Sequence, residues 1–158
     1  MRDLATEFKT LAKSSNVKIE IEIGKDIPKI YSDPFQILQV VENLVFNAVR
    51  YMDFASDDKN KTRNEKKVVV KLFRRGNDVF CEVEDNGIGI PKDDQKFIFQ
   101  KFFRAENVRQ HQTNGSGLGL YISKSIIEKA GGKIGFESLE GKGTTFRFRL
   151  PILPSNGK

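Results

Sequence analysis

A run of closely spaced glycines, "NGSGLGLYISKS" at 114–125, stands directly before a segment with helical periodicity. Glycines in such a turn let the backbone approach a ligand closely and present N–H groups at the positive end of a helix, where phosphate binds. The run is not a dinucleotide fingerprint, because Leu120 stands at the last glycine position, and it is not a P-loop, because no Gly-Lys-Ser/Thr follows. Taken alone, it fits a simple helix cap as well as an anion site.

The segment "VVENLVFNAVRYMD" carries amide side chains on one stripe of a predicted helix. Asn43, Asn47 and Arg50 stand at positions i, i+4 and i+7, with Tyr51 at the edge of the stripe. The two amides could simply hydrogen-bond a neighbouring backbone. Alternatively, their oxygens coordinate a Mg²⁺ that carries phosphate while Arg50 meets the phosphate charge. The second interpretation requires a phosphate-binding loop nearby, and the glycine run is a candidate.

An acidic turn, "VEDNGIGIP", follows a predicted strand. At the strand end, Asp85 could accept a hydrogen bond from a ligand amine such as that of adenine. Gly87 and Gly89 would let the backbone pass close to a flat ring, and Ile88 and Ile90 would add apolar contact. An isolated D-N-G sequence is also a common turn with no ligand at all.

About thirty residues of helix fragments and loop follow this turn, which is long enough to favour a ligand-covering lid over a plain connector. The stretch includes Phe97, Phe99, Phe102 and Phe103. We expect Phe99 and Phe102 to anchor the lid to the domain, and Arg104 to swing toward a terminal phosphate.

The elements that must position these residues follow from periodicity. In chain order we expect a helix at 3–14, a strand at 17–23, a second helix at 35–52 and a hairpin of strands 68–73 and 79–83. The lid at 91–118, a third helix at 120–129 and a second hairpin of strands 134–136 and 145–150 follow. In the third helix we expect Ile122 and Ile126 to point inward. This order predicts an α/β two-layer sandwich, with a mixed, mostly antiparallel sheet covered by helices on one face.

Length and composition favour one soluble domain. The chain has 158 residues, 38% hydrophobic and 30% charged, so we expect a single domain at 1–153 and a flexible tail at 154–158. No apolar run suggests a membrane span or a signal peptide, and the lone Cys81 excludes an internal disulfide, which together fit the cytoplasm. The net charge of +6 is scattered, so we expect no nucleic-acid partner and no membrane contact by this domain.

In this order, "NLVFNAVRY", "DNGIGIP", "FQKFFR", "GSGLGL" and "GKGTTFRFRLP" resemble the boxes of the catalytic and ATP-binding domain of sensor histidine kinases. These kinases belong to the wider GHKL group of ATPases, which includes DNA gyrase, the MutL mismatch-repair proteins and a heat-shock chaperone family. The likeness covers about 3–153, and the combination is specific although each box alone is not. The resemblance implies a Bergerat fold with a mobile lid that holds ATP and Mg²⁺.

The resemblance also implies roles for individual residues. Asn47 would bind Mg²⁺ with Asn43 beside it, and both would act in catalysis with Arg104, which would contact the γ-phosphate. Asp85 would accept from the adenine amino group, supported by Thr144 through water. The full binding set implied by the resemblance is Asn43, Asn47, Arg50, Tyr51, Asp85, Gly87, Gly89, Ile90, Arg104, Gly115, Ser116, Gly117, Leu118, Gly119, Leu120 and Thr144.

One position bears on the reaction. Hydrolysing members of the group carry a glutamate where this chain has Asn43, because attacking water must lose a proton. A neutral imidazole needs no such base, so the resemblance implies transfer of the γ-phosphoryl group to a histidine on a separate dimerisation domain, and then to a response-regulator aspartate in a phosphorelay.

We expect His111, the chain's single histidine, to be a surface residue of the lid. The alternatives are an ATP-driven clamp of the gyrase or chaperone type and a non-catalytic nucleotide-binding module.

Overall fold

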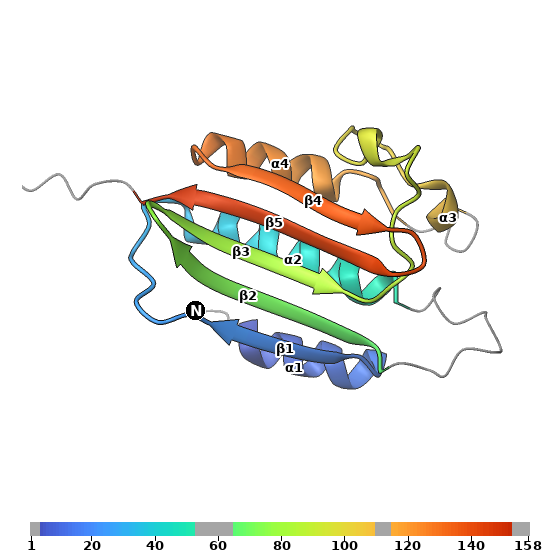
Figure 1. Ribbon diagram of the computed structural model, residues 1–158, viewed down its shortest axis with the longest axis horizontal. Coiled ribbons are helices and arrows are strands. Elements are labelled where there is room, and N and C mark those ends of the chain that lie inside the picture. Colours follow the sequence, from blue (N-terminus) through green and yellow to red (C-terminus); the bar gives the residue numbers. More distant parts are fainter. Residues whose placement is uncertain (1–3, 53–64, 110–114, 153–158) are drawn as a thin grey trace, which may run out of the picture.

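The computed structural model describes residues 4–52, 65–109 and 115–152, and His111 lies outside them. Figure 1 shows a sheet with helices behind it. In chain order the elements are α1 (Leu4–Ser15), β1 (Lys18–Ile23), α2 (Pro34–Arg50), β2 (Lys67–Arg75), β3 (Asp78–Asp85), the 3-10 helix η2 (Gln95–Phe97), α3 (Glu106–Arg109), α4 (Gly119–Lys129), β4 (Lys133–Leu139) and β5 (Gly143–Pro151).

The sheet has five strands in the order β1-β2-β3-β5-β4. The β1 and β2 strands are parallel, whereas the other neighbours are antiparallel. The helices α1, α2 and α4 lie on one face of this sheet (Figure 1). The predicted two-layer sandwich with a mixed, mostly antiparallel sheet is therefore confirmed.

The central helix α2 begins at a strong start signal. The Asp33 side chain accepts hydrogen bonds from the backbone N–H groups of Phe35 and Gln36, and Pro34 occupies the first turn, where its missing N–H costs nothing. The inward face of α2 then packs into the core, with buried residues Val40, Leu44, Val45, Ala48 and Val49. This burial fixes the rotation of α2 and hence the direction in which its asparagine stripe points.

The inward face of α4 differs from the predicted one. Ile126 and Ile127 are buried, together with Ser123, but Ile122 is 39% exposed, so the prediction that Ile122 points inward is wrong. Positions 123, 126 and 127 follow the i, i+3, i+4 spacing of one helix face, and residue 122 is turned about 100° away from residue 123. The hydroxyl of Ser123 is therefore buried on the inward face of α4, where the apolar pattern predicts the side chain of Ile122.

The open face of the sheet carries charge pairs and one aromatic pair. Lys71 pairs with Glu84 at 2.9 Å and Arg149 with Asp78 at 2.8 Å, while Phe73 and Phe80 stack with ring centroids 5.5 Å apart. Such exposed pairs keep this face solvated and add little to the free energy of folding.

Cys81 lies on the opposite, helix-covered side, 3% exposed, where burial raises the thiol pKa to about 12. It acts as a small buried hydrophobe. In the ranges that the structure describes, none of the helices is both long enough and apolar enough to cross a membrane.

Candidate functional site

The residues predicted to bind a ligand lie at one end of the sandwich. Figure 1 shows the end of β3, the end of α2, the beginnings of β5 and α4, and part of the segment 91–118 at the same side of the molecule. We call 91–118 the lid segment, and residues 110–114 of it lie outside the described residues. This arrangement follows from the topology, because antiparallel β3 and β5 bring the last residue of one strand opposite the first residues of the other.

Asp85 is the last residue of β3 and pairs in register with Thr144 of β5. Its Oδ1 accepts hydrogen bonds from the backbone N–H groups of Gly87, at 2.9 Å, and Thr144, at 3.2 Å. Burial nevertheless raises the pKa of this carboxyl to about 6, since the cost of desolvation outweighs the two hydrogen bonds, which lower it. Asp85 is therefore a half-buried carboxylate whose Oδ1 is committed to the backbone.

The turn after Asp85 leaves no room for a side chain at Gly89. Gly89 has a φ of 67°, and a Cβ at this residue would collide with the backbone carbonyl of Leu139. The next residue, Ile90, donates its N–H to the Ser138 hydroxyl at 2.8 Å, and that hydroxyl lies 2.8 Å from the hydroxyl of Thr144. Ser138 thus ties the turn to β4 and β5, a role that no sequence pattern indicated.

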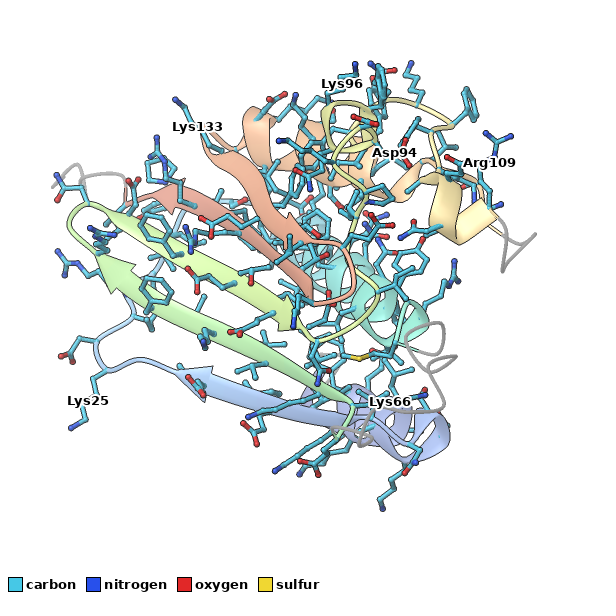
Figure 2. All side chains as sticks on the ribbon, turned by 45° about the vertical axis from the view of Figure 1, so that its right-hand side comes forward. Lys25, Lys66, Asp94, Lys96, Arg109 and Lys133 are labelled. Carbon is cyan, nitrogen blue, oxygen red and sulfur yellow. The ribbon has the colours of Figure 1, made fainter. Side chains whose placement is uncertain are left out.

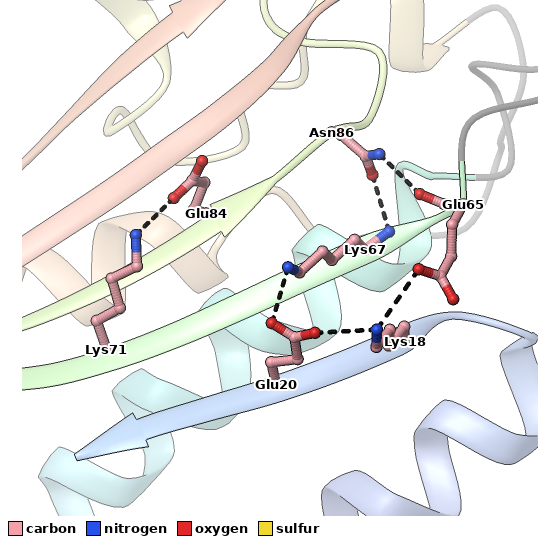
Figure 3. Close-up of polar contacts among 7 residues, drawn as sticks. All are labelled: Lys18, Glu20, Glu65, Lys67, Lys71, Glu84 and Asn86. Atoms are coloured by element: carbon pink, nitrogen blue, oxygen red, sulfur yellow. Dashed lines mark hydrogen bonds and ion pairs between the residues drawn. The ribbon is translucent and has the colours of Figure 1, made fainter.

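Asn86 fixes the other side of the same turn (Figure 3). Its Oδ1 accepts from the backbone N–H of Lys67 at 2.9 Å, and its Nδ2 donates to the backbone carbonyl of Glu65 at 2.9 Å. The Asn86 side chain therefore supplies hydrogen bonds to the backbone at the start of β2, as a neighbouring strand would. Around it, Lys67 and Lys18 both pair with Glu20, at 2.7 and 3.1 Å.

The helix α2 links this turn to the glycine run. At its C-terminal end, the backbone carbonyl of Tyr51 accepts from Ile88 at 3.4 Å. Two turns earlier, Asn43 donates its Nδ2 to the Ser123 hydroxyl of α4 at 2.9 Å, and a Cβ at Gly119 would collide with the Asn43 side chain. Contacts along one helix thus connect the acidic turn and the first residues of α4.

Two arginines approach the first glycine of the run. A Cβ on Gly115 would lie 3.7 Å from the Cζ and Nε atoms of Arg104 and 3.7 Å from Nη1 of Arg50. One cation comes from the last turn of α2 and the other from the lid segment. Two guanidinium groups at the mouth of a glycine turn attract an anion with more than one negative charge.

The lid segment binds the glycine run through its backbone. Phe102 donates its N–H to the carbonyl of Gly117 at 2.9 Å, and Gly117 has a φ of 67° that suits glycine. Phe102 itself is 71% exposed with a φ of 63°, so the prediction that it anchors the lid in the core is wrong. Ile98 is the buried anchor instead, with Phe99 and Phe103 packed against the core. The strained backbone of Phe102 serves the contact with Gly117 and turns its ring outward.

Further contacts tie the lid segment to the turn. Asp94 caps α3 by accepting from the N–H of Glu106 at 2.7 Å, and Asn107 of α3 donates its Nδ2 to the carbonyl of Gly89 at 3.1 Å. Figure 2 shows Asp94 and Arg109 together in the lid segment, whereas Lys25, after β1, lies on the far side of the molecule. No sequence pattern indicates a site role for Asn107 or for Ser138.

The oxygen donors at this end of the sandwich suit a metal ion that binds together with a phosphate-bearing ligand. Among residues 4–52, 65–109 and 115–152, no three His, Cys, Asp or Glu side chains gather as a metal cage. The amide oxygens of Asn43 and Asn47, one turn apart on α2, are hard neutral donors. Such donors fit Mg²⁺, which keeps waters and substrate phosphates in most of its coordination positions.

A family model described as "Histidine kinase-, DNA gyrase B-, and HSP90-like ATPase" matches residues 32–154, well over half of the chain. The chain belongs to this ATPase family. Among its relatives, the sensor histidine kinase RppB of Synechocystis sp. is 32% identical over 150 residues, which cover 95% of this chain and 31% of RppB. The ATPase-family chain thus spans about a third of that relative.

Solved structures place this ATPase domain among histidine kinases. The catalytic domain of the histidine kinase ThkA matches with a TM-score of 0.73 and 29% identity, over 94% of this chain and 89% of that one. Full-length ShkA in complex with AMPPNP matches with a TM-score of 0.73 and 26% identity, over 93% of this chain and 28% of ShkA. The ATPase domain is therefore a catalytic and ATP-binding domain of the sensor histidine kinase type, and its Bergerat fold is confirmed.

The ATPase fold brings the predicted site residues into two neighbouring groups. Asp85, Thr144 and the turn at 87–90 form one group, and Arg50, Arg104 and the glycine run form the other. Ser116 and Leu118 belong to the second group, with the Ser116 hydroxyl accepting from the N–H of Leu118 at 3.3 Å, and Leu120 packs partly against the core.

Proposed function

We propose that this domain binds ATP with Mg²⁺ and donates the γ-phosphoryl group to a histidine on a separate dimerisation domain of its parent protein. The observation that carries the proposal is the connection along α2, where Tyr51 touches the acidic turn and Asn43 touches the beginning of α4. One ligand with a flat amine-bearing base at one end and several phosphates at the other would use both groups. ATP has this shape, and the named relatives are sensor histidine kinases.

At the base end, we assign the adenine amino group to Asp85. Oδ1 is held by two backbone N–H groups, and Oδ2 has no hydrogen-bond partner among the described residues, so it is available to accept from the ligand. Gly89 and Ile90 would line the ring, Gly87 would let it approach, and Thr144 would support it through water.

At the phosphate end, we assign Arg50, Arg104 and 115–120 to the triphosphate. The arginines supply charge, and the glycine run supplies N–H groups at the beginning of α4. Asn47, with Asn43 beside it, would hold Mg²⁺, which neutralises phosphate charge when bound. We assign Tyr51 to the nucleotide edge, at the end of α2.

The reaction needs no general base from this chain. A neutral imidazole nitrogen attacks the γ-phosphorus with its own lone pair, the bond between that phosphorus and the β–γ bridging oxygen breaks, and ADP leaves with the bond electrons. Arg104 would stabilise the charge on the transferred group. Asn43 cannot take a proton from water, and Glu42 is turned about 100° around α2. This chemistry favours transfer over steady hydrolysis, and so disfavours an ATP-driven clamp.

The finer assignments follow from the same proposal. Residues 1–153 would form one catalytic unit with 91–118 as its lid and 154–158 as a tail. The phosphorylated histidine would pass its group to a response-regulator aspartate, and the domain would work in the cytoplasm, whatever anchors its parent protein.

The raised pKa of Asp85 predicts a pH dependence. The carboxyl titrates near pH 6 in the nucleotide-free domain, and only its ionised form accepts well from an amine. Affinity for adenosine, which has no titrating phosphate, should therefore be constant above pH 7 and fall by about tenfold at pH 5, where about a tenth of the carboxyl is ionised. Nuclear magnetic resonance (NMR) of the Asp85 carboxyl carbon should give a midpoint near pH 6 that adenosine lowers. A midpoint near the ordinary value, unmoved by adenosine, would contradict the assignment.

The function is tested by mixing the domain with the histidine-bearing domain of its parent and ATP labelled in the γ-phosphate. We expect label on the partner in an acid-labile, base-stable linkage, as histidine phosphate requires, and none when Asn47 is replaced by Ala. Release of labelled phosphate without label on the partner would favour the clamp, and nucleotide binding without either would favour a regulatory module.

A further inference from the structure

We propose that Ser123 is a positioning residue that holds the side chain of Asn43 with its amide oxygen directed toward the phosphate end of the site. The inference rests on the proposed function, because it assigns an orientation to a residue proposed to lie beside Mg²⁺. It adds a residue of α4 that does not itself touch the nucleotide.

Two residues of α4 form a notch for the Asn43 side chain. Gly119 and Ser123 are four residues apart, so they lie one turn apart on the same helix face. The Asn43 Nδ2 donates to the Ser123 Oγ at 2.9 Å, while the Asn43 Oδ1 lies so close to Gly119 that a Cβ there would collide with it. The missing side chain of Gly119 makes room for the amide, and the hydroxyl of Ser123 holds one end of it.

The burial of Ser123 requires a partner. Its side chain is 2% exposed and stands beside Ile126 and Ile127 on the inward face of α4. A buried hydroxyl without a hydrogen bond destabilises a protein, because it has lost its contacts with water and gained none in return. Asn43, 80 residues earlier in the chain, is the partner that offsets this cost. The contact thus joins α2 to the second turn of α4.

The orientation of the amide decides what Asn43 can do. The two ends of a carboxamide differ, since the NH₂ group donates and the oxygen accepts or binds a cation. With Nδ2 held by Ser123, Oδ1 remains for Mg²⁺, for its waters or for the glycine run. A rotated amide would present NH₂ instead, and NH₂ repels a cation. Residues that orient a metal ligand in this way change metal affinity by about 10- to 100-fold when they are lost.

The test compares Ser123→Ala with Ser125→Ala, a control on the same helix whose side chain makes no hydrogen bond to the described residues. Binding of a non-hydrolysable ATP analogue is measured over a range of Mg²⁺ concentrations and also without metal. For Ser123→Ala we expect the Mg²⁺ concentration for half-maximal binding to rise roughly 10- to 100-fold, with metal-free affinity changed less than about threefold. Ser125→Ala should match the wild type in both.

A second readout uses the nucleotide-free protein. The side-chain NH₂ signals of Asn43 in ¹H–¹⁵N NMR spectra should exchange slowly with solvent in the wild type and quickly in Ser123→Ala. Fast exchange in the wild type would mean that the amide is rotated, and would overturn the proposal. An unchanged Mg²⁺ requirement in Ser123→Ala, or an equal loss with and without metal, would overturn it as well. If the wild type binds no nucleotide, the proposed function fails, whereas the NMR comparison still decides whether Ser123 holds Asn43.

Discussion

Replacing Asp85 by Asn should weaken ATP binding and stabilise the nucleotide-free domain at the same time. The substituted side chain keeps an oxygen for the N–H groups of Gly87 and Thr144. It then turns an NH₂ group toward the amino group of adenine, so two donors face each other. Loss of a charge-assisted hydrogen bond of about 1.5–3 kcal/mol corresponds to a fall in affinity of roughly 10- to 150-fold.

The stability gain follows from the sign of the pKa shift. Burial raises the pKa of Asp85 from 3.8 to about 6, so the folded protein holds its proton more tightly than the unfolded chain. The carboxylate therefore destabilises the fold at neutral pH by an amount on the order of 3 kcal/mol, and this penalty disappears below about pH 4. Chemical denaturation should show Asp85→Asn more stable than wild type above pH 6 and equal to it near pH 4.

The neighbouring carboxylate supplies the control. Glu84 lies on the open face of the sheet, where it pairs with Lys71. Glu84→Gln should leave ATP affinity at neutral pH unchanged and lower the midpoint of the pH dependence only slightly, because the Glu84 charge is the smallest of the contributions to the pKa of Asp85. If Asp85→Asn were less stable than wild type at pH 7 and still bound ATP, Asp85 would be a structural residue of the turn and nothing more.

Replacing Gly117 by Ala should detach the glycine run from the lid segment. The φ of 67° disfavours any residue with a Cβ, and the added atom would lie 2.6 Å from the carbonyl carbon of Phe102. The hydrogen bond from Phe102 to Gly117 cannot survive this displacement. We expect ATP affinity to fall by at least about tenfold, the equivalent of 1.4 kcal/mol, while unfolding stays cooperative because neither residue is in the core.

Gly76 gives a matched control for Gly117. It lies in the β2–β3 hairpin with a φ of 61°, and a Cβ there meets nothing within 4 Å. Gly76→Ala carries the same backbone penalty of about 1–2 kcal/mol without the collision. It should lower the free energy of unfolding and leave nucleotide affinity unchanged. Equal losses of affinity in the two variants would mean that the contact with Phe102 has no part in binding.

Local pattern was sufficient to predict the elements and their order. The helical spacing of Asn43, Asn47 and Arg50 places them on one stripe of α2, and Asp85 does fall at the end of its strand. These features depend on the spacing of apolar residues along helices and strands and on the residues that form turns, and both can be read from a single sequence. The sheet is built from two hairpins and two crossovers, one from β1 to β2 through α2 and one from β3 to β4 through α4.

Contacts between segments far apart in the sequence determine several side-chain positions that the local pattern does not predict. The partner of Asn43 is a serine 80 residues away. Of the two residues of that helix predicted to point inward, Ile126 is buried and Ile122 is not. Phe102 reads as one more core aromatic, yet a left-handed backbone turns it outward to reach Gly117. Ser138 and Asn107 hold the acidic turn from β4 and α3. Each of these contacts exists only after distant elements have met.

The most direct test of a shared nucleotide site is an NMR titration of the domain with a non-hydrolysable ATP analogue and Mg²⁺. If one nucleotide occupies the site, backbone signals of Asn47, Asp85 and Gly117, from three separate parts of the chain, should shift along one binding curve with a single dissociation constant. Signals from the open face, such as those of Glu82 and Arg149, should stay in place. Shifts at only one of the three residues, or different midpoints among them, would contradict a single nucleotide site.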